Sequence, residues 1–189
     1  ISNLETGKLM LDQMYAAGKL GNAELEDLAD IFARVGNNAK TAGLSFEGSL
    51  AFIERMSLVE RQPERLATLV DSTLRLFTNQ SYQDEAARVT GVNFYNKDGS
   101  RREMFDVLAD IRERYRANFK TDAERDKAFS QAFGKTDLDT QRGLRIFFDA
   151  ESIEDARRFS GEIGNAGGLI ARELPNAVSN AVDQVSRLK

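Results

Sequence analysis

The amino-acid sequence predicts an all-α fold, a helical bundle or orthogonal array with one small β-turn or hairpin element near residues 92–99. Apolar residues recur at spacings of three and four along most of the 189-residue chain, which is the period of a helix with one buried face. Capping residues and glycines divide this pattern into segments of ordinary helix length. Because helices joined by short loops bury their apolar faces against one another, we expect a packed helical domain.

Composition suits one soluble globular domain, or one domain with an appendage. The 26 basic and 30 acidic residues give a net charge of -4, which does not indicate the basic face of a nucleic-acid-binding protein. The chain lacks cysteine and histidine, which excludes disulfides, thiolate chemistry and Ser–His or Cys–His catalytic pairs. No stretch approaches the roughly 18 apolar residues of a membrane span, and no signal peptide is visible. Because the chain begins at Ile1 and not at Met, we expect it to be a fragment of a longer protein or a processed one.

The N-terminal segment predicts two helices. A capping box over Ser2-Asn3-Leu4-Glu5 opens a helix that runs to about Ala17, where Gly18 and Gly21 end it. Asn22 is expected to cap the second helix, because a short amide side chain can accept a bond from a free backbone N–H. The predicted buried face of this helix comprises Leu25, Leu28, Phe32 and Val35.

Two further helices and a short one follow. The second helix ends near Gly43, and Ser45 caps the third. Pro63 suits the first turn of the fourth, where its missing N–H costs nothing. A short helix is predicted from Tyr82 to Val89. The predicted stripes of the third and fourth helices are Phe46, Leu50, Ile53 and Ser57, and Ala67, Val70, Leu74 and Phe77.

The region from Ala86 to Ile111 organises the chain. Gly91 should end a helix, and the alternation over Val92–Tyr95 predicts a short strand with one buried face. Asp98-Gly99 is a turn dipeptide, because glycine accepts positive φ. Ser100-Arg101-Arg102-Glu103 is interpreted as a capping box. The helix behind it should bury Phe105, Leu108, Ile111 or Arg112, Tyr115 and Phe119.

The C-terminal third predicts three more helical segments and a glycine-rich stretch. Thr121–Glu124 forms a capping box for a helix that Gly134 ends, and Leu138–Phe148 reads as the next helix. Ser152–Asp155 is expected to cap another. Gly161–Gly168 is interpreted as a hinge or a close-packed helix segment, since each glycine disfavours helix by about 1 kcal/mol relative to alanine. The predicted core positions are Ala128, Phe129, Ala132, Phe133, Leu144, Phe147 and Phe148.

We predict two parts: a helical core domain over residues 1–168, and a C-terminal amphipathic helix over 169–189 that leads toward the rest of a longer chain. Apolar residues in the second part are spaced 4, 3, 4 and 3, which is the a/d repeat of a coiled coil. Two heptads are few, so an ordinary amphipathic helix docked on the bundle is the alternative. The repeat consists of Leu174, Val178, Ala181, Val185 and Leu188.

The sequence offers no catalytic, cofactor-binding or metal-binding candidate. Asn96, Asp98 and Ser100 resemble the first ligands of a calcium loop, but Arg101 and Val107 stand where that loop needs Gly and Glu. Carboxylates at Asp137–Asp139 and at Asp149, Glu151, Glu154 and Asp155 could suggest a glycosidase pair. They lie at predicted helix starts, where negative charge complements the helix dipole, so capping is the preferred interpretation.

One basic and aromatic run could bind nucleic acid. It comprises Arg101, Arg102, Arg112, Arg114 and Arg116, with Tyr95, Tyr115 and Phe119 nearby. Acidic residues are interleaved at Glu103, Asp106, Asp110 and Glu113, and i,i+3 and i,i+4 pairs on a solvated face are the preferred interpretation. No Gly-rich phosphate loop is present, because Gly164–Gly168 lacks a following Lys-Ser/Thr.

The order of these turns resembles the core region of bacteriophage tail tape-measure proteins over roughly Glu24 to Phe148. The matching parts are Ala39–Glu47, Gly91 with Val92–Tyr95, Asp98-Gly99, Arg101–Ile111, and Phe133-Gly134-Lys135 with Gly143-Leu144. The resemblance implies a non-enzymatic phage or prophage protein that sets tail length during assembly and is released at genome ejection. It implies a location in the virion tail lumen, and in the host cytoplasm during assembly.

The implied partners are tail tube subunits, tail assembly chaperones and other copies of the chain. No cofactor, small-molecule substrate or specific nucleic-acid site is expected, and membrane contact is expected only through parts of the parent chain outside this fragment. The alternative is a helical protein–protein interaction module with no phage role.

Overall fold

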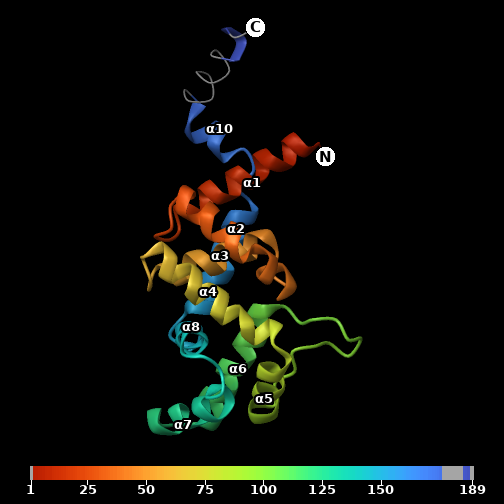
Figure 1. Ribbon diagram of the computed structural model, residues 1–189, viewed down its shortest axis with the longest axis vertical. Helices are drawn as coiled ribbons and strands as arrows, with labels where there is room; N and C mark the ends of the chain where they lie inside the picture. Colours follow the sequence, from red (N-terminus) through yellow and green to blue (C-terminus); the bar gives the residue numbers. More distant parts are fainter. Residues whose placement is uncertain (1, 176–184, 188–189) are drawn as a thin grey trace.

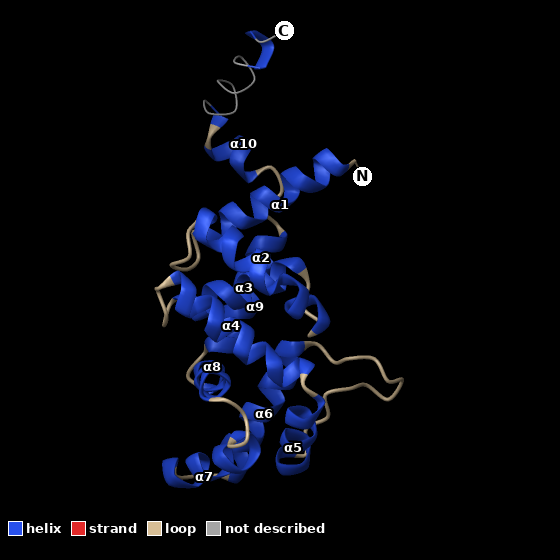
Figure 2. Cartoon of the chain, viewed as in Figure 1, coloured by secondary structure: helices blue, strands red, loops and turns tan. Residues whose placement is uncertain are grey.

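The computed structural model describes residues 2–175 and 185–187, and the fold over these ranges is all-α, as predicted (Figure 2). Within them, the β structure amounts to one antiparallel bridge between Tyr95 and Arg101. The helices are α1 Asn3–Gly18, α2 Leu25–Thr41, α3 Phe46–Ser57, α4 Pro63–Thr78, α5 Gln80–Thr90, α6 Met104–Asn118, α7 Asp122–Phe133, α8 Leu138–Phe148, α9 Ser152–Gly164 and α10 Leu169–Glu173.

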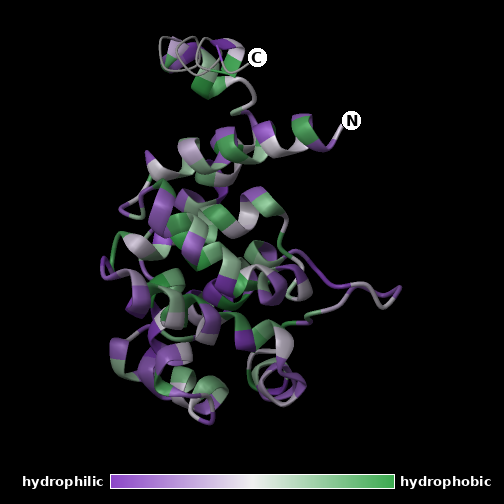
Figure 3. Cartoon of the chain, turned by 45° about the horizontal axis from the view of Figure 1, so that its top comes forward, coloured by the Kyte–Doolittle hydropathy of each residue, from purple (hydrophilic) through white to green (hydrophobic). Residues whose placement is uncertain are grey.

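The helices stack along one long axis (Figure 1). Helices α1 and α10 lie at one end, α5 and α7 lie at the other, and the segment between α5 and α6 projects sideways as an extended loop. No helix in the described ranges combines the length and apolar character that a bilayer crossing requires. Each long helix carries both hydrophobic and hydrophilic positions, as amphipathic helices of a packed domain do (Figure 3).

The core is centred on α3, α4, α8 and α9. Helix α3 packs most extensively against α9, and α4 against α8. Phe52 of α3 stacks on Phe147 of α8 with ring centroids 4.7 Å apart and an interplanar angle of 6°. Phe105 of α6 lies 6.3 Å from Phe147 and 6.4 Å from Phe52, so three helices share one aromatic cluster. Ala67, Val70, Leu74 and Phe77 are all buried, as their spacing predicts.

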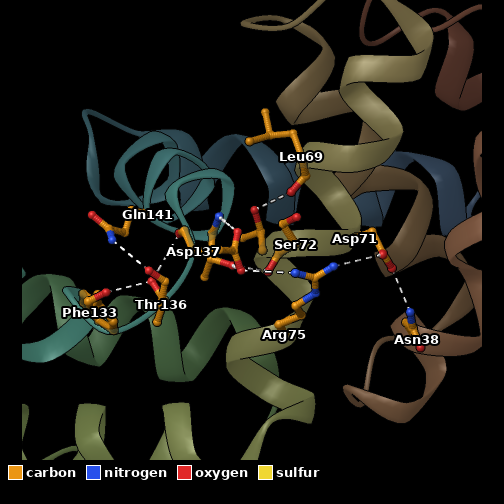
Figure 4. Close-up of polar contacts among 11 residues, drawn as sticks. Asn38, Leu69, Asp71, Ser72, Arg75, Phe133, Thr136, Asp137 and Gln141 are labelled. Atoms are coloured by element: carbon orange, nitrogen blue, oxygen red, sulfur yellow. Dashed lines mark hydrogen bonds and ion pairs between the residues drawn. The ribbon is translucent and has the colours of Figure 1, made fainter.

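A polar seam joins α4 to the start of α8 (Figure 4). Asp137 caps α8 by accepting the Thr140 N–H at 2.9 Å, which confirms the capping role predicted for this carboxylate. The Thr140 hydroxyl donates to the Ser72 carbonyl of α4 at 2.6 Å. Arg75 of α4 donates to the other Asp137 oxygen at 3.2 Å. The seam therefore fixes the position of α8 along α4.

Several predicted helix ends are confirmed. Both reciprocal bonds of a capping box are present at Ser2 and at Thr121. Ser45 accepts the Gly48 N–H at 3.0 Å, and Pro63 is the first residue of α4. Gly91 ends α5 with a left-handed φ of 73°. Helix α5 begins at Gln80, two residues before the predicted Tyr82, because Asn79 caps it.

The predicted cap at Asn22 is wrong, because this residue has a tertiary partner. Its backbone N–H donates to Ser57 Oγ at 2.8 Å, and its side-chain amide donates to the Ser57 carbonyl at 3.1 Å. Helix α2 instead starts after Glu24, which makes no side-chain capping bond. The predicted cap at Ser152 is wrong for the same reason. Ser152 is the first residue of α9, and its hydroxyl accepts a bond from Arg55 at 2.8 Å.

The capping box predicted at Ser100 is also wrong. The Ser100 hydroxyl donates to Asp98 at 2.6 Å, within the turn. Glu103, predicted as the reciprocal partner, is itself the N-cap of α6, and its carboxylate accepts the N–H groups of Phe105 and Asp106. A local side-chain bond thus displaces the helix start by three residues.

The predicted strand over Val92–Tyr95 does not form. Val92 and Phe94 are buried and Asn93 is exposed, so the alternation of faces is correct. The pairing is too short for a ladder: the Arg102 N–H donates to the Phe94 carbonyl at 3.0 Å, beside the single bridge. A two-stranded pairing of this length gains too little to extend.

The glycine-rich stretch contains the end of α9 and the turn before α10, and it is not close-packed at Gly161, while the hinge interpretation stays a prediction. Helix α9 continues through Gly161, where the space beside the Cα is open, and ends at Gly164. Gly168 has φ 78° and precedes α10. Of the predicted a/d repeat, Leu174 and Val185 are exposed, while Val178, Ala181 and Leu188 lie outside the described residues.

Candidate functional site

Helices α6, α7 and α8 and the turn after α8 line an open groove with a volume of about 780 Å³. We call it the arginine–aromatic groove, because guanidinium groups and aromatic rings make up most of its lining. The lining residues are Arg112, Tyr115, Arg116, Asp122, Arg125, Asp126, Phe129, Arg145, Phe148, Asp149 and Ala150.

Local sequence positions the α7 side of the groove. The Thr121 capping box starts the helix, and Asp122, Asp126 and Phe129 follow at intervals of four and three residues. That spacing places these side chains on one helical face, toward the groove. Phe133 lies one turn further on and is fully buried, with its ring centroid 5.0 Å from that of Phe129.

The floor of the groove is aromatic. The Phe148 ring lies 5.9 Å from Tyr115 and 6.3 Å from Phe129, measured between ring centroids. The Tyr115 hydroxyl donates to the Ala128 carbonyl at 3.3 Å, which ties α6 to α7. Burial raises the pKa of Tyr115 above its ordinary value, so this hydroxyl stays protonated.

Arg112 is the buried cation of the groove. It forms a bidentate pair with Glu154 of α9, in which one Nη1–Oε2 distance is 2.8 Å. The hydrogen bonds from Arg112 lower the pKa of Glu154 to about 2. The Arg112 Nε–H is buried and has no hydrogen-bond partner among the described residues.

The turn between α8 and α9 is strained beneath these arginines. Ala150 has a φ of 38°, and among the described residues it is the only non-glycine residue with a positive φ. Its carbonyl accepts bonds from Arg112 at 3.4 Å and from Arg116 at 3.2 Å. Such a conformation costs on the order of 1–3 kcal/mol and persists where the surroundings hold it. Here two guanidinium groups supply that restraint.

Paired charges form the rim. Arg145 lies over the Phe129 ring at 3.9 Å from its centroid and bonds Asp126 at 3.2 Å. Arg125 bonds Asp122 at 3.3 Å and donates to the Phe119 carbonyl at 3.1 Å. The lining holds four arginines and three aspartates, so the rim is close to neutral. Aromatic rings with arginine at a near-neutral rim are typical of a protein-contact surface rather than of a phosphate groove.

The basic run singled out in the sequence is dispersed by the fold. Arg112 and Arg116 line the groove, but Arg101 reaches the Phe77 carbonyl at 2.6 Å, and Arg102 bonds the Asn93 carbonyl at 2.8 Å. Arg114 points toward the Gly91 backbone.

The expected i,i+3 and i,i+4 ion pairs are wrong for this run. Arg102 pairs with Asp110, eight residues away, and Asp106 pairs with Arg157 of α9. The capping interpretation is wrong for the carboxylates near α9, because the N-cap Glu151 makes no side-chain capping bond. Glu154 and Asp155 lie in the first turn of α9 and form ion pairs, Glu154 with Arg112 and Asp155 with Arg55 at 3.4 Å.

Arg125 and Arg145 belong to the groove and were not singled out from the sequence. A usable signal exists: Arg125 and Phe129 are four residues apart, and Arg145 and Phe148 are three apart, so each cation shares a helical face with a ring. That signal is weak, because the groove forms only when α6, α7 and α8 meet.

The calcium-like triplet is a turn. Asp98 accepts both the N–H and the hydroxyl of Ser100, and Asn96 donates to the Ser100 hydroxyl at 2.9 Å. Over the described residues, no group of three or more acidic side chains is arranged to hold a metal ion.

Residues 3–134 match the family model described as Phage-related minor tail protein. No curated protein and no solved structure matches the chain. The matched range covers α1 to α7, whereas α8 and α9, which complete the core, lie beyond it.

Proposed function

The chain belongs to the phage-related minor tail protein family, and from that premise we propose that it is part of a tail tape-measure protein. Such a protein is a scaffold that sets tail length during assembly and leaves the tail at genome ejection. The observation that carries the proposal is the family match over residues 3–134, which contains most of the turns that resemble the tape-measure core. Gly43, Gly91 and Gly99 in those turns have φ between 73° and 93°.

The proposed role is structural and not enzymatic. Its working parts are helix surfaces, foremost the arginine–aromatic groove, which combines arginine side chains with a largely buried aromatic floor. The proposed partners are tail tube subunits, tail assembly chaperones and other copies of the chain, with the tail lumen and the host cytoplasm as locations. Peptidoglycan incubated with the purified protein should remain intact, and its degradation would contradict a purely structural role.

Compact packing limits how this segment can act as a ruler. As one continuous helix, 189 residues would span roughly 280 Å at about 1.5 Å per residue. Packed as a globule, the same chain has a radius of gyration of about 16 Å. We therefore propose that flanking sequence carries most of the length, with residues 1–168 as a core domain and 169–189 as the helix leading onward.

The test is tail length in the phage or prophage that encodes the chain. One in-frame deletion removes the segment, and a matched deletion removes 189 residues of helical flank. The flank deletion should shorten tails by roughly 280 Å in electron micrographs, while the segment deletion should shorten intact tails far less or block assembly. Tails of unchanged length after the flank deletion would overturn the tape-measure role.

A further inference from the structure

The turn between α1 and α2, residues 19–24, is fastened to the C-terminal end of α3 by buried polar contacts. The Ala23 N–H donates to Glu54 Oε1 at 3.0 Å, and the Asn22 N–H donates to Ser57 Oγ at 2.8 Å. The Ser57 hydroxyl in turn donates to the Glu54 carbonyl at 2.5 Å. Gly21 makes this approach possible, because a Cβ there would lie 2.6 Å from both the Glu54 carbonyl oxygen and Ser57 Oγ. We call this set of residues the Glu54 latch.

Glu54 is a carboxyl group without a cation. Its side chain is fully buried, and Oε2 has no hydrogen-bond partner among the described residues. Burial raises the pKa of Glu54 to about 8, against the smaller opposing effect of the bonds from Ala23 and Ser57. Glu54 is therefore neutral at pH 7, and the α1–α2 turn is held by this protonated carboxyl group.

The two cations nearest the latch in the sequence, Lys19 and Arg55, are engaged elsewhere. Arg55, the next residue on α3, turns to Asp155 of α9, and Lys19 of the turn pairs with Glu173 of α10. Asp12 of α1 caps α10, and Glu60 beyond α3 pairs with Arg142 of α8. No ion pair in the described ranges includes Glu54. An ionised Glu54 would thus be an unpaired buried charge, which is strongly unfavourable.

The helices beyond the latch bury little apolar surface. The buried residues of α1 are Asp12, Gln13, Met14, Ala16 and Ala17, and α10, which lies wholly within the described ranges, has none. Helix α10 is attached through Asp12, which accepts the N–H groups of Gly168 at 2.8 Å and Ile170 at 3.0 Å, and through Glu173. Such elements open at lower free energy than a core of packed phenylalanines and leucines.

We propose that the Glu54 latch holds α1 and α10 as one unit that opens before the rest of the fold, and that loss of the Glu54 proton releases this unit. Helices α1 and α10, the first and last helices of the continuous range 2–175, lie at the same end of the molecule (Figure 1). Opening would free α1 and α10 while α3, α4, α8 and α9 stay packed. This proposal depends only on contacts within the fold, so it does not require that the chain sets tail length.

The direction of the pH effect follows from the two protonation states. In the open unit Glu54 meets water and has an ordinary carboxyl pKa, whereas in the closed unit its pKa is about 8. The free energy of closure is therefore most favourable below the Glu54 pKa of the open unit and becomes less favourable as pH rises toward 8. Above pH 8 it no longer changes with pH. Between those limits, the equilibrium constant for opening should rise about tenfold per pH unit.

The experiment is amide hydrogen exchange by mass spectrometry on the full chain from pH 5 to 9, with protection factors corrected for intrinsic exchange. Amides of α1 and residues 165–173 should exchange together and faster than those of α4 and α8, and their protection should fall about tenfold per pH unit up to about pH 8. Glu54→Gln should flatten this dependence. Glu47→Gln, on the same helix but partly exposed, should keep it.

Two results would overturn the proposal: exchange of α1 at the same rate as α4 and α8, or an unchanged pH dependence in Glu54→Gln. Should Glu54→Gln fail to fold, Gly21→Ala supplies a second test. Its added Cβ should reduce α1 protection at every pH, while circular dichroism shows that most helix remains. Full α1 protection in Gly21→Ala would also contradict the latch.

Discussion

Gly143 of α8 lies directly against Thr73 of α4. A Cβ at position 143 would overlap the Thr73 hydroxyl and come within 2.9 Å of the Met56 methyl group. The Thr73 hydroxyl is itself held, because it donates to the Leu69 carbonyl at 2.6 Å. Gly143→Ala should therefore destabilise the fold by about 2 kcal/mol in urea unfolding, through overpacking at the closest approach of the two helices.

Two variants make that expectation specific. The double variant Thr73→Ala/Gly143→Ala should lose less stability than the sum of the two single losses. The reason is that the worst overlap, with the Thr73 hydroxyl, is removed, although the Thr73 Cβ and the Met56 methyl group stay 2.9 Å from the added Cβ. Gly161→Ala places the same methyl group in open space on α9 and should stabilise by up to about 1 kcal/mol. A loss of stability at Gly161→Ala equal to that at Gly143→Ala would show that the close approach is not the cause.

The range matched by the family model should not fold alone. Ending the chain at Gly134 removes Leu144, Phe147, Ile153, Phe159 and Ile163, all of which are buried. At roughly 2 kcal/mol for each side chain, the loss is about 10 kcal/mol, comparable to the whole stability of a domain. Residues 2–134 should show weak, non-cooperative thermal unfolding by circular dichroism, whereas residues 2–173 should unfold in one transition. A cooperative transition for the shorter piece would disprove this.

The pair of Arg112 and Glu154 should make stability fall in acid. The pKa of Glu154 is about 2, below its ordinary 4.5, so its contribution is present above pH 4.5 and is lost as pH falls toward 2. The Glu154 side chain is 48% exposed, and solvent screening reduces the effect to about 1 kcal/mol. Glu154→Gln should be less stable than the parent at pH 7 and nearly equal to it at pH 2 in urea titrations. Equal differences at both pH values would exclude the pair as the source.

Gly99 should resist β-branched substitution for backbone reasons alone. Its φ is 87°, and no atom lies within 4 Å of an added Cβ. Gly99→Val should lower stability by about 1 kcal/mol or more, while Gly99→Asn should be tolerated better because asparagine accepts a left-handed conformation. Differential scanning calorimetry on the two variants provides the comparison, and equal melting temperatures would mean that the turn tolerates other conformations.

The sequence by itself determined which segments are helical and, for most of them, which face is buried. Leu25 is an exception: it was predicted on the buried face of its helix and is exposed, because it is the first residue of α2. Apolar spacing of three and four is a local property, so the stripes from Ala67 to Phe77 and from Ala128 to Phe133 could be predicted and are buried. The turns at Gly91 and Gly99 could also be predicted from the sequence, because glycine adopts a positive φ far more readily than other residues. The bounds of α8 agree with the sequence at both ends.

Only the tertiary structure decided which polar side chains bond partners far away in the sequence. Asn22 and Ser152 have capping chemistry, yet Asn22 bonds Ser57 and Ser152 bonds Arg55, because the fold brings these distant residues within reach. The arginine–aromatic groove joins residues from three helices, and the Glu54 latch joins residues more than 30 positions apart. Such contacts depend on distances in space that residue spacing along the chain does not encode. The burial that keeps the Glu54 carboxyl group protonated is likewise a property of the packed helices and not of the local sequence.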